Sequence, residues 1–475
     1  MIVRAIQMTR RDFLESASLV LPAAGLAGAA PAASTGNLPG TGLLTWEGDL
    51  SERMMEGAHR FVERKIGESA STRVRRWKRD LSSRTAYEQS VEANRARLRT
   101  IIGVVDAREP ASMDTVASAG DVAVVAETPT FRVHQVRWPV FEDVFGEGLW
   151  LEPAGSPSGY VVALPDADQT PEQIAGLAPG ISPENQFARR LAANGFSVVV
   201  PTLIDRTARW SGHPDIRLTD QPHREWIYRQ AFHMGRHVIG YEVQKVLAVV
   251  DWFERQRAAG VKIGVAGYAE GGLIALYAAA IDPRIDAALV SGYFDNRQHV
   301  WSEPIYSNVW ALLAEFGDAE IATLIAPRGL TIEHSRVPDI TSPRGDLRTP
   351  AFDSVRREYE RIESLTRPGF QPLRLISVED GVACGPGSQQ AVEAFAGQLG
   401  GPDSLPMPAG LPSDSRHGFS PDERQKRQVR GMEKHVQSLI QSDVVTRPLP
   451  KGHGHRDYHA STERIVLPRH WAPSV

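Results

Sequence analysis

Residues 261–286, VKIGVAGYAEGGLIALYAAAIDPRID, constrain the fold of this 475-residue chain more than any other stretch. The segment opens with an apolar run typical of a buried strand and ends with an apolar, alanine-rich run typical of a buried helix. Only the glycine-rich turn GYAEGG separates the two. A strand that passes directly into a buried helix indicates a sheet with helices packed on it.

The same alternation of strand and helix recurs between residues 159 and 400. Apolar runs such as GYVVALP (159–165) and FSVVVP (196–201) each precede a longer segment with helical spacing. Two alternating runs, at 130–141 and 149–153, predict antiparallel edge strands. The chain is therefore predicted to form an α/β fold with a mostly parallel, doubly wound sheet, whose sites lie beyond the carboxyl ends of the strands.

Charge and cysteine content narrow the possible functions. The formal net charge of -4 gives no support to nucleic-acid binding. A basic run at 73–84, RVRRWKRDLSSR, is predicted to be a solvated helix face. The single cysteine, Cys384, excludes intramolecular disulfides, so the core must be stabilised by packing.

The N-terminus has the pattern of an export signal. The stretch TRRDFL (9–14) precedes a short apolar run, and APA (30–32) supplies small residues suited to a signal peptidase. We expect residues 1–33 to be a twin-arginine signal peptide and the protein to be periplasmic or extracellular. The apolar run is too short to span a membrane, and no membrane association is expected after its removal.

Composition divides the remaining chain into four parts. We predict a linker at 34–48, a helical N-terminal extension at 51–125, a sheet-containing domain at 130–402, and a C-terminal helix with an irregular tail at 403–475. The tail carries His453, His455 and His459, which are compatible with metal binding, but we favour a disordered end.

The turn GYAEGG is typical of a nucleophile elbow, in which a strained tip residue stands at the start of a helix. The order of elements and this turn resemble the α/β-hydrolase fold, and in particular the dienelactone hydrolase and acetyl xylan esterase groups, over residues 130–400. The resemblance implies Ser or Cys at the tip of the elbow. Here the tip is Ala269, which has neither a lone pair nor a proton with which to attack a carbonyl.

The resemblance also implies an acid and a histidine after two later strands. The acid position is occupied by Asp339 or Glu333, after the strand at 329–335. The loop after the last strand, 372–378, holds no histidine, so His417, within SRHGFSP, is the candidate. The predicted catalytic residues are Glu270, Asp339 and His417, with Ala269 in the place of the nucleophile.

Carboxylates gather where the resemblance implies an oxyanion-binding loop. The strand GYVVALP is followed by Asp166 and Asp168, and Glu270 begins the elbow helix. Such a group suits a hard cation, a polyhydroxylated sugar, or general acid and base catalysis. For Glu270, we favour the simpler role of capping the helix dipole over catalysis. We expect no metal and no other cofactor.

Two loops facing the same edge, 221–237 and 291–306, are dense in aromatic and charged residues. Loops of this kind on a rigid scaffold usually bind ligands, although packing of the loops accounts for part of them. The predicted substrate-binding residues are Asp166, Asp168, His223, Arg224, Glu225, Trp226, Tyr293, Arg297, Trp301 and His334.

These observations leave three functional hypotheses. The first is an exported hydrolase of carbohydrate or aryl esters that uses an unusual mechanism. The second is a catalytically inactive hydrolase-like domain that binds a sugar, an aryl ligand or a partner protein. The third is a metal-dependent hydrolase that uses Asp166, Asp168 and Glu270. The expected partner is a small-molecule or carbohydrate ligand, and the oligomeric state is left open.

Overall fold

The computed structural model describes residues 40–116, 123–212, 215, 219–378 and 381–446, with side chains as far as residue 442. The predicted signal at 1–33 and the three tail histidines lie outside these residues. The chain divides into two compact units, Met1–Phe61 and Val62–Val475. Within the described ranges, no helix is both long enough and apolar enough to cross a membrane.

Helices precede the sheet in the chain, but the predicted helical extension at 51–125 also contains β1 (Asp114–Thr115) and the start of β2 (Val124–Glu127). The helices are α2 (Leu50–Thr72), the short 3-10 helix η1 (Arg73–Arg76) and α3 (Arg84–Ile101). The basic run at 73–84 is solvated only in part: Arg75, Arg76, Lys78 and Arg84 are exposed as predicted, whereas Arg73 and Arg79 are not. Arg73 is buried, its Nη1 lies 3.5 Å from Glu320, and Arg79 donates to Thr323. The guanidiniums of Arg73 and Arg79 therefore attach this segment to residues 313–323.

Ten strands form one sheet in the described part of the chain. Their order is β1-β3-β4-β6-β5-β7-β8-β9-β10, and β2 pairs with β3. The pairs β3–β4 and β4–β6 are antiparallel, and the pairs from β6 to β10 are parallel. The bounds are β1 Asp114–Thr115, β2 Val124–Glu127, β3 Phe131–Phe141, β4 Val144–Pro153, β5 Gly159–Leu164, β6 Phe196–Pro201, β7 Ile263–Tyr268, β8 Ala287–Ser291, β9 Gly329–Glu333 and β10 Leu373–Ile376.

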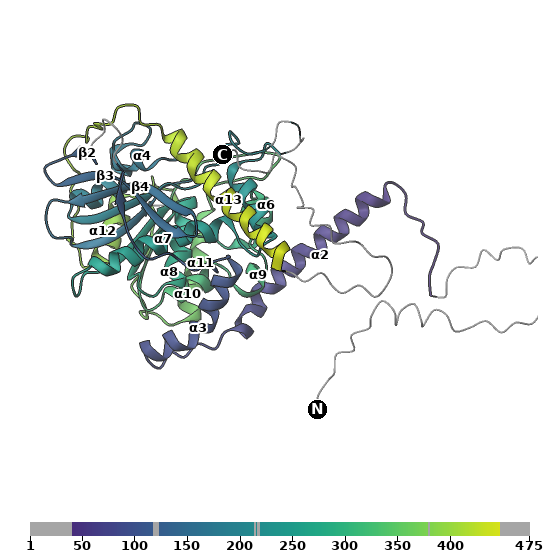
Figure 1. Ribbon diagram of the computed structural model, residues 1–475. Coiled ribbons are helices and arrows are strands. Elements are labelled where there is room, and N and C mark those ends of the chain that lie inside the picture. Colours follow the sequence, from purple (N-terminus) through teal and green to yellow (C-terminus); the bar gives the residue numbers. More distant parts are fainter. Residues whose placement is uncertain (1–39, 117–122, 213–214, 216–218, 379–380, 447–475) are drawn as a thin grey trace, which may run out of the picture. The chain divides into compact units, whose positions relative to one another are not determined.

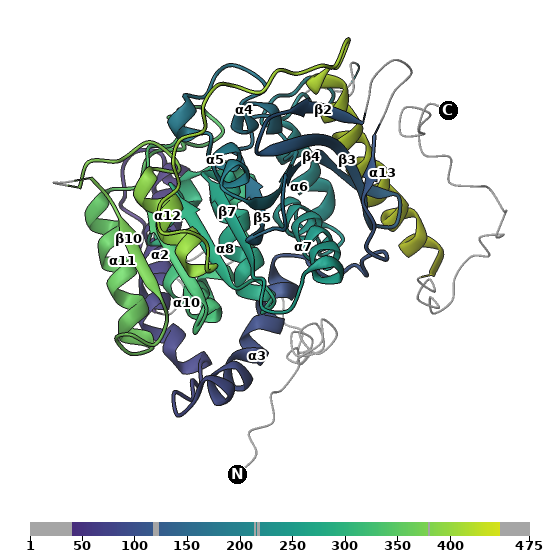
Figure 2. The same ribbon diagram turned by 90° about the vertical axis from the view of Figure 1, so that its left-hand side faces the viewer.

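Helices cover both faces of this sheet (Figures 1 and 2). One layer packs around α5 (Phe187–Ala193) and α12 (Gln389–Gln398), and the other around α7 (Val238–Gln256), α8 (Glu270–Ile281) and α10 (Asp318–Ile325). The other helical elements are α4 Pro171–Ala175, η2 Pro183–Asn185, α6 His223–Phe232, η3 Arg297–Ser302, η4 Ile305–Ser307, α9 Leu312–Glu315, α11 Phe352–Leu365 and α13 Pro421–Thr446.

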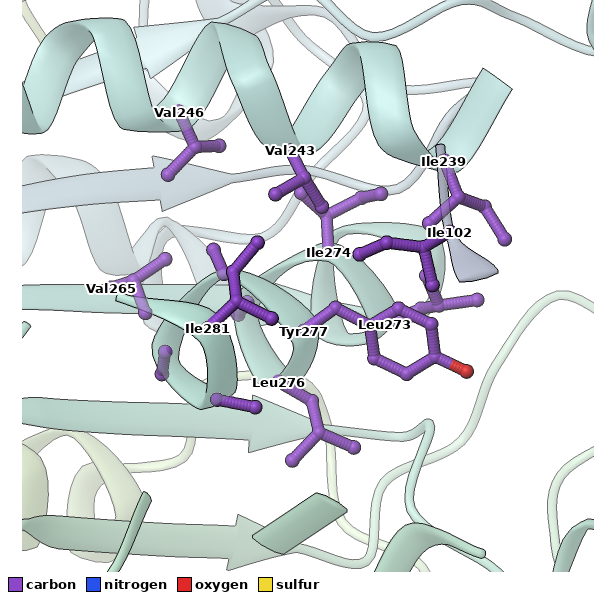
Figure 3. Close-up of a cluster of buried hydrophobic side chains, with 14 of the residues drawn as sticks. Ile102, Ile239, Val243, Val246, Val265, Leu273, Ile274, Leu276, Tyr277 and Ile281 are labelled. Carbon is purple, nitrogen blue, oxygen red and sulfur yellow. The ribbon is translucent and has the colours of Figure 1, made fainter. Parts of the chain in front are cut away.

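Helix α8 is buried along its whole length, which explains why its sequence is apolar on every side. Figure 3 shows Val243 and Val246 of α7 directed toward Ile274 and Ile281 of α8. Two leading antiparallel strands, a parallel sheet and an elbow between the central strand β7 and α8 confirm the predicted α/β-hydrolase fold. This fold places the elbow at the carboxyl edge of the sheet.

Candidate functional site

Ala269 occupies the tip of a well-formed elbow between β7 and α8. Its backbone has φ 51° and ψ −113°, a conformation that costs an alanine on the order of 1–3 kcal/mol. A Cβ at Gly267 would lie 2.0 Å from the Gly271 carbonyl oxygen, and one at Gly271 would lie 2.4 Å from that of Leu164. The glycines therefore permit the sharp bend, and the strain is retained although no nucleophile stands at the tip.

The backbone N–H that follows the tip residue already has an anionic partner. In an elbow of this kind, the amide after the nucleophile is one of the donors that stabilise an oxyanion. Here the Glu270 amide donates to Asp166 Oδ1 at 3.2 Å. Asp166 directly follows Pro165 at the end of β5, and it is 1% exposed. A carboxylate of the protein itself thus occupies the place of the oxyanion.

Arg206 fixes that carboxylate. Its Nη1 and Nη2 donate to the two oxygens of Asp166 at 2.7 and 2.9 Å, which is the bidentate arrangement. The same guanidinium donates to Asp168 at 3.0 Å and to Glu270 at 3.3 Å, and its Nε donates to Tyr306 Oη at 3.0 Å. Burial alone would raise the pKa of Asp166, but Arg206 holds that pKa below its usual value. Asp166 is therefore a carboxylate.

A second buried arginine secures Glu270 from the other side. Arg224 Nη2 donates to Glu270 Oε1 at 2.7 Å and lies 2.9 Å from Glu242 Oε2. Arg224 and Glu242 are fully buried. Burial raises the pKa of Glu270, while Arg224 and Arg206 act against that rise. Glu270 therefore stands at the start of α8, and its two carboxylate oxygens both accept from arginines.

A small pocket with a cavity volume of about 60 Å³ lies over the elbow and opens to solvent. Its floor includes the Ala269 methyl group and Leu273, and charged and apolar side chains form its walls. The lining residues are Arg206, Ala269, Glu270, Leu273, Gly292, Tyr293, Arg297, Glu303, Ser307, Val337, Pro338, Leu347, Arg348 and Pro350.

Each guanidinium in the pocket wall is paired with a carboxylate. Arg206 binds the acids described above, Arg297 lies 2.5 Å from Glu303, and Arg348 lies 2.9 Å from Asp346. Arg297 also stacks over the Tyr293 ring at 4.6 Å. The pocket therefore offers matched hydrogen-bond donors and acceptors rather than an excess of one charge.

Glu333, one of the two candidates for the acid, has a structural role at the end of β9. Glu333 is 1% exposed, and its Oε2 accepts from Ser291 Oγ at 2.5 Å and from the Gly387 amide at 2.8 Å. Its Oε1 accepts from the Ser388 amide at 2.8 Å. Gly387 and Ser388 end the loop between β10 and α12, where the resemblance implied a histidine. Glu333 thus ties that loop to the sheet.

The structure places Asp339 and His417 away from the pocket lining. Asp339 is exposed in the loop after β9, next to the lining residue Pro338. His417 is also exposed, and the two residues before it are bound to the antiparallel strands β2 and β3. The Ser415 amide donates to Val125 of β2, and Arg416 donates to Gln135 of β3. Neither residue lines the pocket with Glu270, so the structure does not assemble the predicted catalytic group.

Tyr293 and Arg297 line the pocket, whereas Trp301 is 54% exposed on η3 and is not part of the lining. His334 lies behind the wall. Its Nε2–H donates to the carbonyl of the lining residue Pro350 at 2.9 Å, so its ring supports the wall rather than lining the pocket.

The predicted binding residues of α6 are used within the protein. His223 is fully buried, its Nδ1–H donates to Asp205, and its Nε2 accepts from the Trp210 amide at 3.0 Å. Glu225 forms ion pairs with Arg229 and Arg344, at 2.9 and 3.4 Å. Trp226 donates to Glu433 of α13 at 3.1 Å. Apart from Arg224, which holds Glu270, this segment stabilises the loop rather than the pocket.

Arg206 was not among the residues predicted from the sequence, although it contacts more of the site than any predicted residue does. Its partners are Asp166, Asp168, Glu270 and Tyr306. Its position in the sequence could have indicated a role in the site. Arg206 follows strand β6, and sites in parallel sheets lie beyond the carboxyl ends of the strands. Arg206 also bears on the metal hypothesis. Its guanidinium occupies the space between Asp166, Asp168 and Glu270, so these carboxylates do not fit a cation. The described residues contain no other His, Cys, Asp and Glu cluster suited to a metal.

Comparisons with known proteins agree with the fold. Residues 172–315 match the model of the dienelactone hydrolase family, which confirms the predicted resemblance to that group. No curated protein matched the chain.

Several solved structures are distantly similar to the chain. A glucuronoyl esterase from Solibacter usitatus is 12% identical, with 68% of this chain and 95% of that chain covered and a TM-score of 0.44. Acetyl xylan esterase 1 from a Thermoanaerobacterium species is 12% identical, with 69% and 98% covered and a TM-score of 0.40. A glucuronoyl esterase from Teredinibacter turnerae is 12% identical, with 74% and 86% covered and a TM-score of 0.41.

Proposed function

We propose that this protein is a hydrolase-like binding protein, which holds a carbohydrate or aryl ligand in the pocket over Ala269 and does not cleave esters at the elbow. The single observation that carries the proposal is the Asp166 carboxylate on the Glu270 amide. An ester carbonyl at the elbow would meet a methyl group instead of a nucleophile and a fixed negative charge instead of an oxyanion donor.

The chemistry of the pocket supports this choice of ligand. One side is apolar, with Leu273, Val337 and Leu347, and the other presents ion pairs such as Arg297–Glu303. A ring with one apolar face and several hydroxyl groups satisfies both sides, because paired arginine and glutamate groups donate to and accept from hydroxyls. The Tyr293 ring adds an aromatic surface on which such a ring packs.

One observation favours a second function. Burial raises the pKa of Glu270, which lines the pocket beside the elbow, and a carboxyl group of this kind suits general acid catalysis without a covalent intermediate. This alternative keeps the protein an exported hydrolase. It is less well supported, because both oxygens of Glu270 already accept from arginines.

The location that we propose is outside the cytoplasm, by the twin-arginine route. The support for this location is the pattern of residues 9–14 and 30–32. Fusion of residues 1–33 to a reporter that requires this route would test it, with replacement of the paired arginines Arg10 and Arg11 by lysines as the control.

Binding is tested by isothermal titration of the natural chain with a panel of neutral methyl and aryl glycosides. We expect at least one of them to bind and the affinity to fall when Leu273→Trp fills the pocket floor. A matched change outside the pocket, Trp301→Phe, should leave the affinity unchanged. Equal binding by the natural chain and the Leu273→Trp variant would refute a site in this pocket.

A further inference from the structure

His435 of α13 occupies an unusual place for an imidazole. It is 3% exposed, and its ring lies 4.7 Å from the Phe141 ring and 5.6 Å from the Tyr241 ring. Neither ring nitrogen has a hydrogen-bond partner among the described residues. A neutral ring packs between the two aromatic rings. An imidazolium would bring a charge and two N–H donors into the same space, which is far more costly.

The charged groups around His435 do not compensate for that cost. Glu142 and Asp143 lie in the turn between β3 and β4. Asp106 follows α3, Arg236 lies just before α7, and Lys434 is on α13. Glu142 Oε2 lies 3.9 Å from His435 Nδ1, but the Glu142 side chain is 70% exposed. Asp143 pairs with Lys434 at 3.1 Å, and Asp106 pairs with Arg236 at 2.7 Å. Burial therefore outweighs the acids and lowers the pKa of His435.

Two successive hydrogen-bonded contacts lead from α13 to the pocket. Glu433, two residues before His435, accepts from Trp226 Nε1 of α6 at 3.1 Å. Two residues earlier in α6, Arg224 donates to the pocket residue Glu270 at 2.7 Å. Figure 1 shows α13 lying along α6, and the two helices are in contact. These two contacts connect α13 to α6 and to the base of the pocket.

We propose that α13 is an acid-sensitive clasp: protonation of His435 loosens the docking of its C-terminal half and, through Trp226 and Arg224, the support of Glu270. The N-terminal half stays bound, because Arg424 and Arg427 pair with the buried Glu172 and Glu147, both at 2.7 Å. Since the neutral ring is the form that fits, docking is complete above the ordinary histidine pKa of about 6.5 and weakens as the pH falls below it. Acidity would in this way regulate the pocket.

The test is amide hydrogen exchange of the full chain at about pH 7.5 and about pH 5, with rates corrected for intrinsic exchange. We expect residues 431–442 and 223–232 of the natural chain to exchange severalfold faster at the lower pH. His435→Phe keeps a flat ring that cannot titrate, and it should abolish this pH dependence. His435→Leu serves the same purpose if the phenylalanine variant does not fold. His237, whose pKa burial lowers to about 4, also loses stability over this pH range, so the comparison is repeated in a His237→Asn background, where the response of α13 should persist.

A third variant tests the connection between the helices. Trp226→Phe removes the donor to Glu433, so the response of α13 should persist while that of α6 disappears. The proposal is overturned if the natural chain shows no pH dependence in α13, or if both His435 variants retain it. An acid response of α6 that survives in Trp226→Phe would overturn the connection to the pocket.

Discussion

The carboxylate of Asp166 accepts the backbone N–H of Glu270 at 3.2 Å, in the position where an elbow of this fold would hold an oxyanion. The two residues are 104 positions apart in the chain and meet only because β5 and β7 are neighbours in the sheet. Because of this contact, the elbow lacks a free oxyanion donor as well as a nucleophile. The predictions below follow from this arrangement and from the groups that support it.

Restoring a hydroxyl at the tip should not restore catalysis. Ala269→Ser supplies a nucleophile, but Asp166 still occupies the Glu270 amide, and no histidine among the described residues lines the pocket to activate the serine. We expect hydrolysis of p-nitrophenyl acetate by this variant to equal that of the natural chain. Turnover that rises with the serine would show that a base and a free oxyanion donor exist.

The strained tip should become more stable with glycine. Ala269 holds φ at 51°, and glycine adopts this conformation without the steric cost. Ala269→Gly is expected to raise the free energy of unfolding by about 1 kcal/mol, after allowance for the greater freedom of glycine in the unfolded chain. Urea titration measures the change. A loss of stability would mean that the packing of the methyl group outweighs the strain.

Asp166 and Asp168 bind the same arginine but should differ in their contribution to the free energy of unfolding. Asp166→Asn breaks a buried ion pair and should cost about 3 kcal/mol of unfolding free energy. Asp168→Asn is the matched control, since its side chain is 42% exposed and exposed pairs contribute about 0–1 kcal/mol. Equal losses of unfolding free energy in the two variants would contradict the role of Asp166 as the buried partner of Arg206.

Glu333 should behave as a structural residue and Asp339 as a surface residue. Glu333→Gln places an amide nitrogen among three donors and should cost about 2 kcal/mol of unfolding free energy. Asp339→Asn should change this free energy by less than about 0.5 kcal/mol. Chemical denaturation of both variants checks the pair of values, and a large effect at Asp339 would argue for a role that the structure does not show.

His237 should make the fold sensitive to acid. Burial lowers its pKa from 6.5 to about 4. The neutral ring accepts from the Ile239 amide and donates to the Asn308 carbonyl. Because the unfolded chain binds the proton more readily, stability should fall by about 3 kcal/mol as the pH drops from about 6.5 to about 4. His237→Asn keeps a helix cap and should flatten that slope, whereas the exposed His417→Asn should not.

The fold was predictable because its signals are local. Apolar runs at 159–165 and 196–201 are the strands β5 and β6, and Gly267 and Gly271 marked the elbow. Each of these signals depends on a few consecutive residues. The hydrophobic pattern therefore sufficed to place the elbow at the edge of a parallel sheet.

The site was less predictable, because it depends on which loops converge. Arg206 and Glu333 carry no motif, and their partners come from other strands and helices. His417 stands in a stretch that looks like a catalytic loop, but Arg416 attaches that stretch to β3. Local resemblance could not reveal this attachment. It also could not show that Asp166 faces the Glu270 amide.

The most direct test of the account is steady-state ester hydrolysis by the purified natural chain, measured with aryl acetates and acetylated sugars beside a Glu270→Gln variant. The account predicts that the natural chain hydrolyses these esters no faster than buffer alone, and that the variant behaves in the same way. Turnover by the natural chain that disappears in Glu270→Gln would contradict it and would establish an esterase that works without a nucleophile at the elbow.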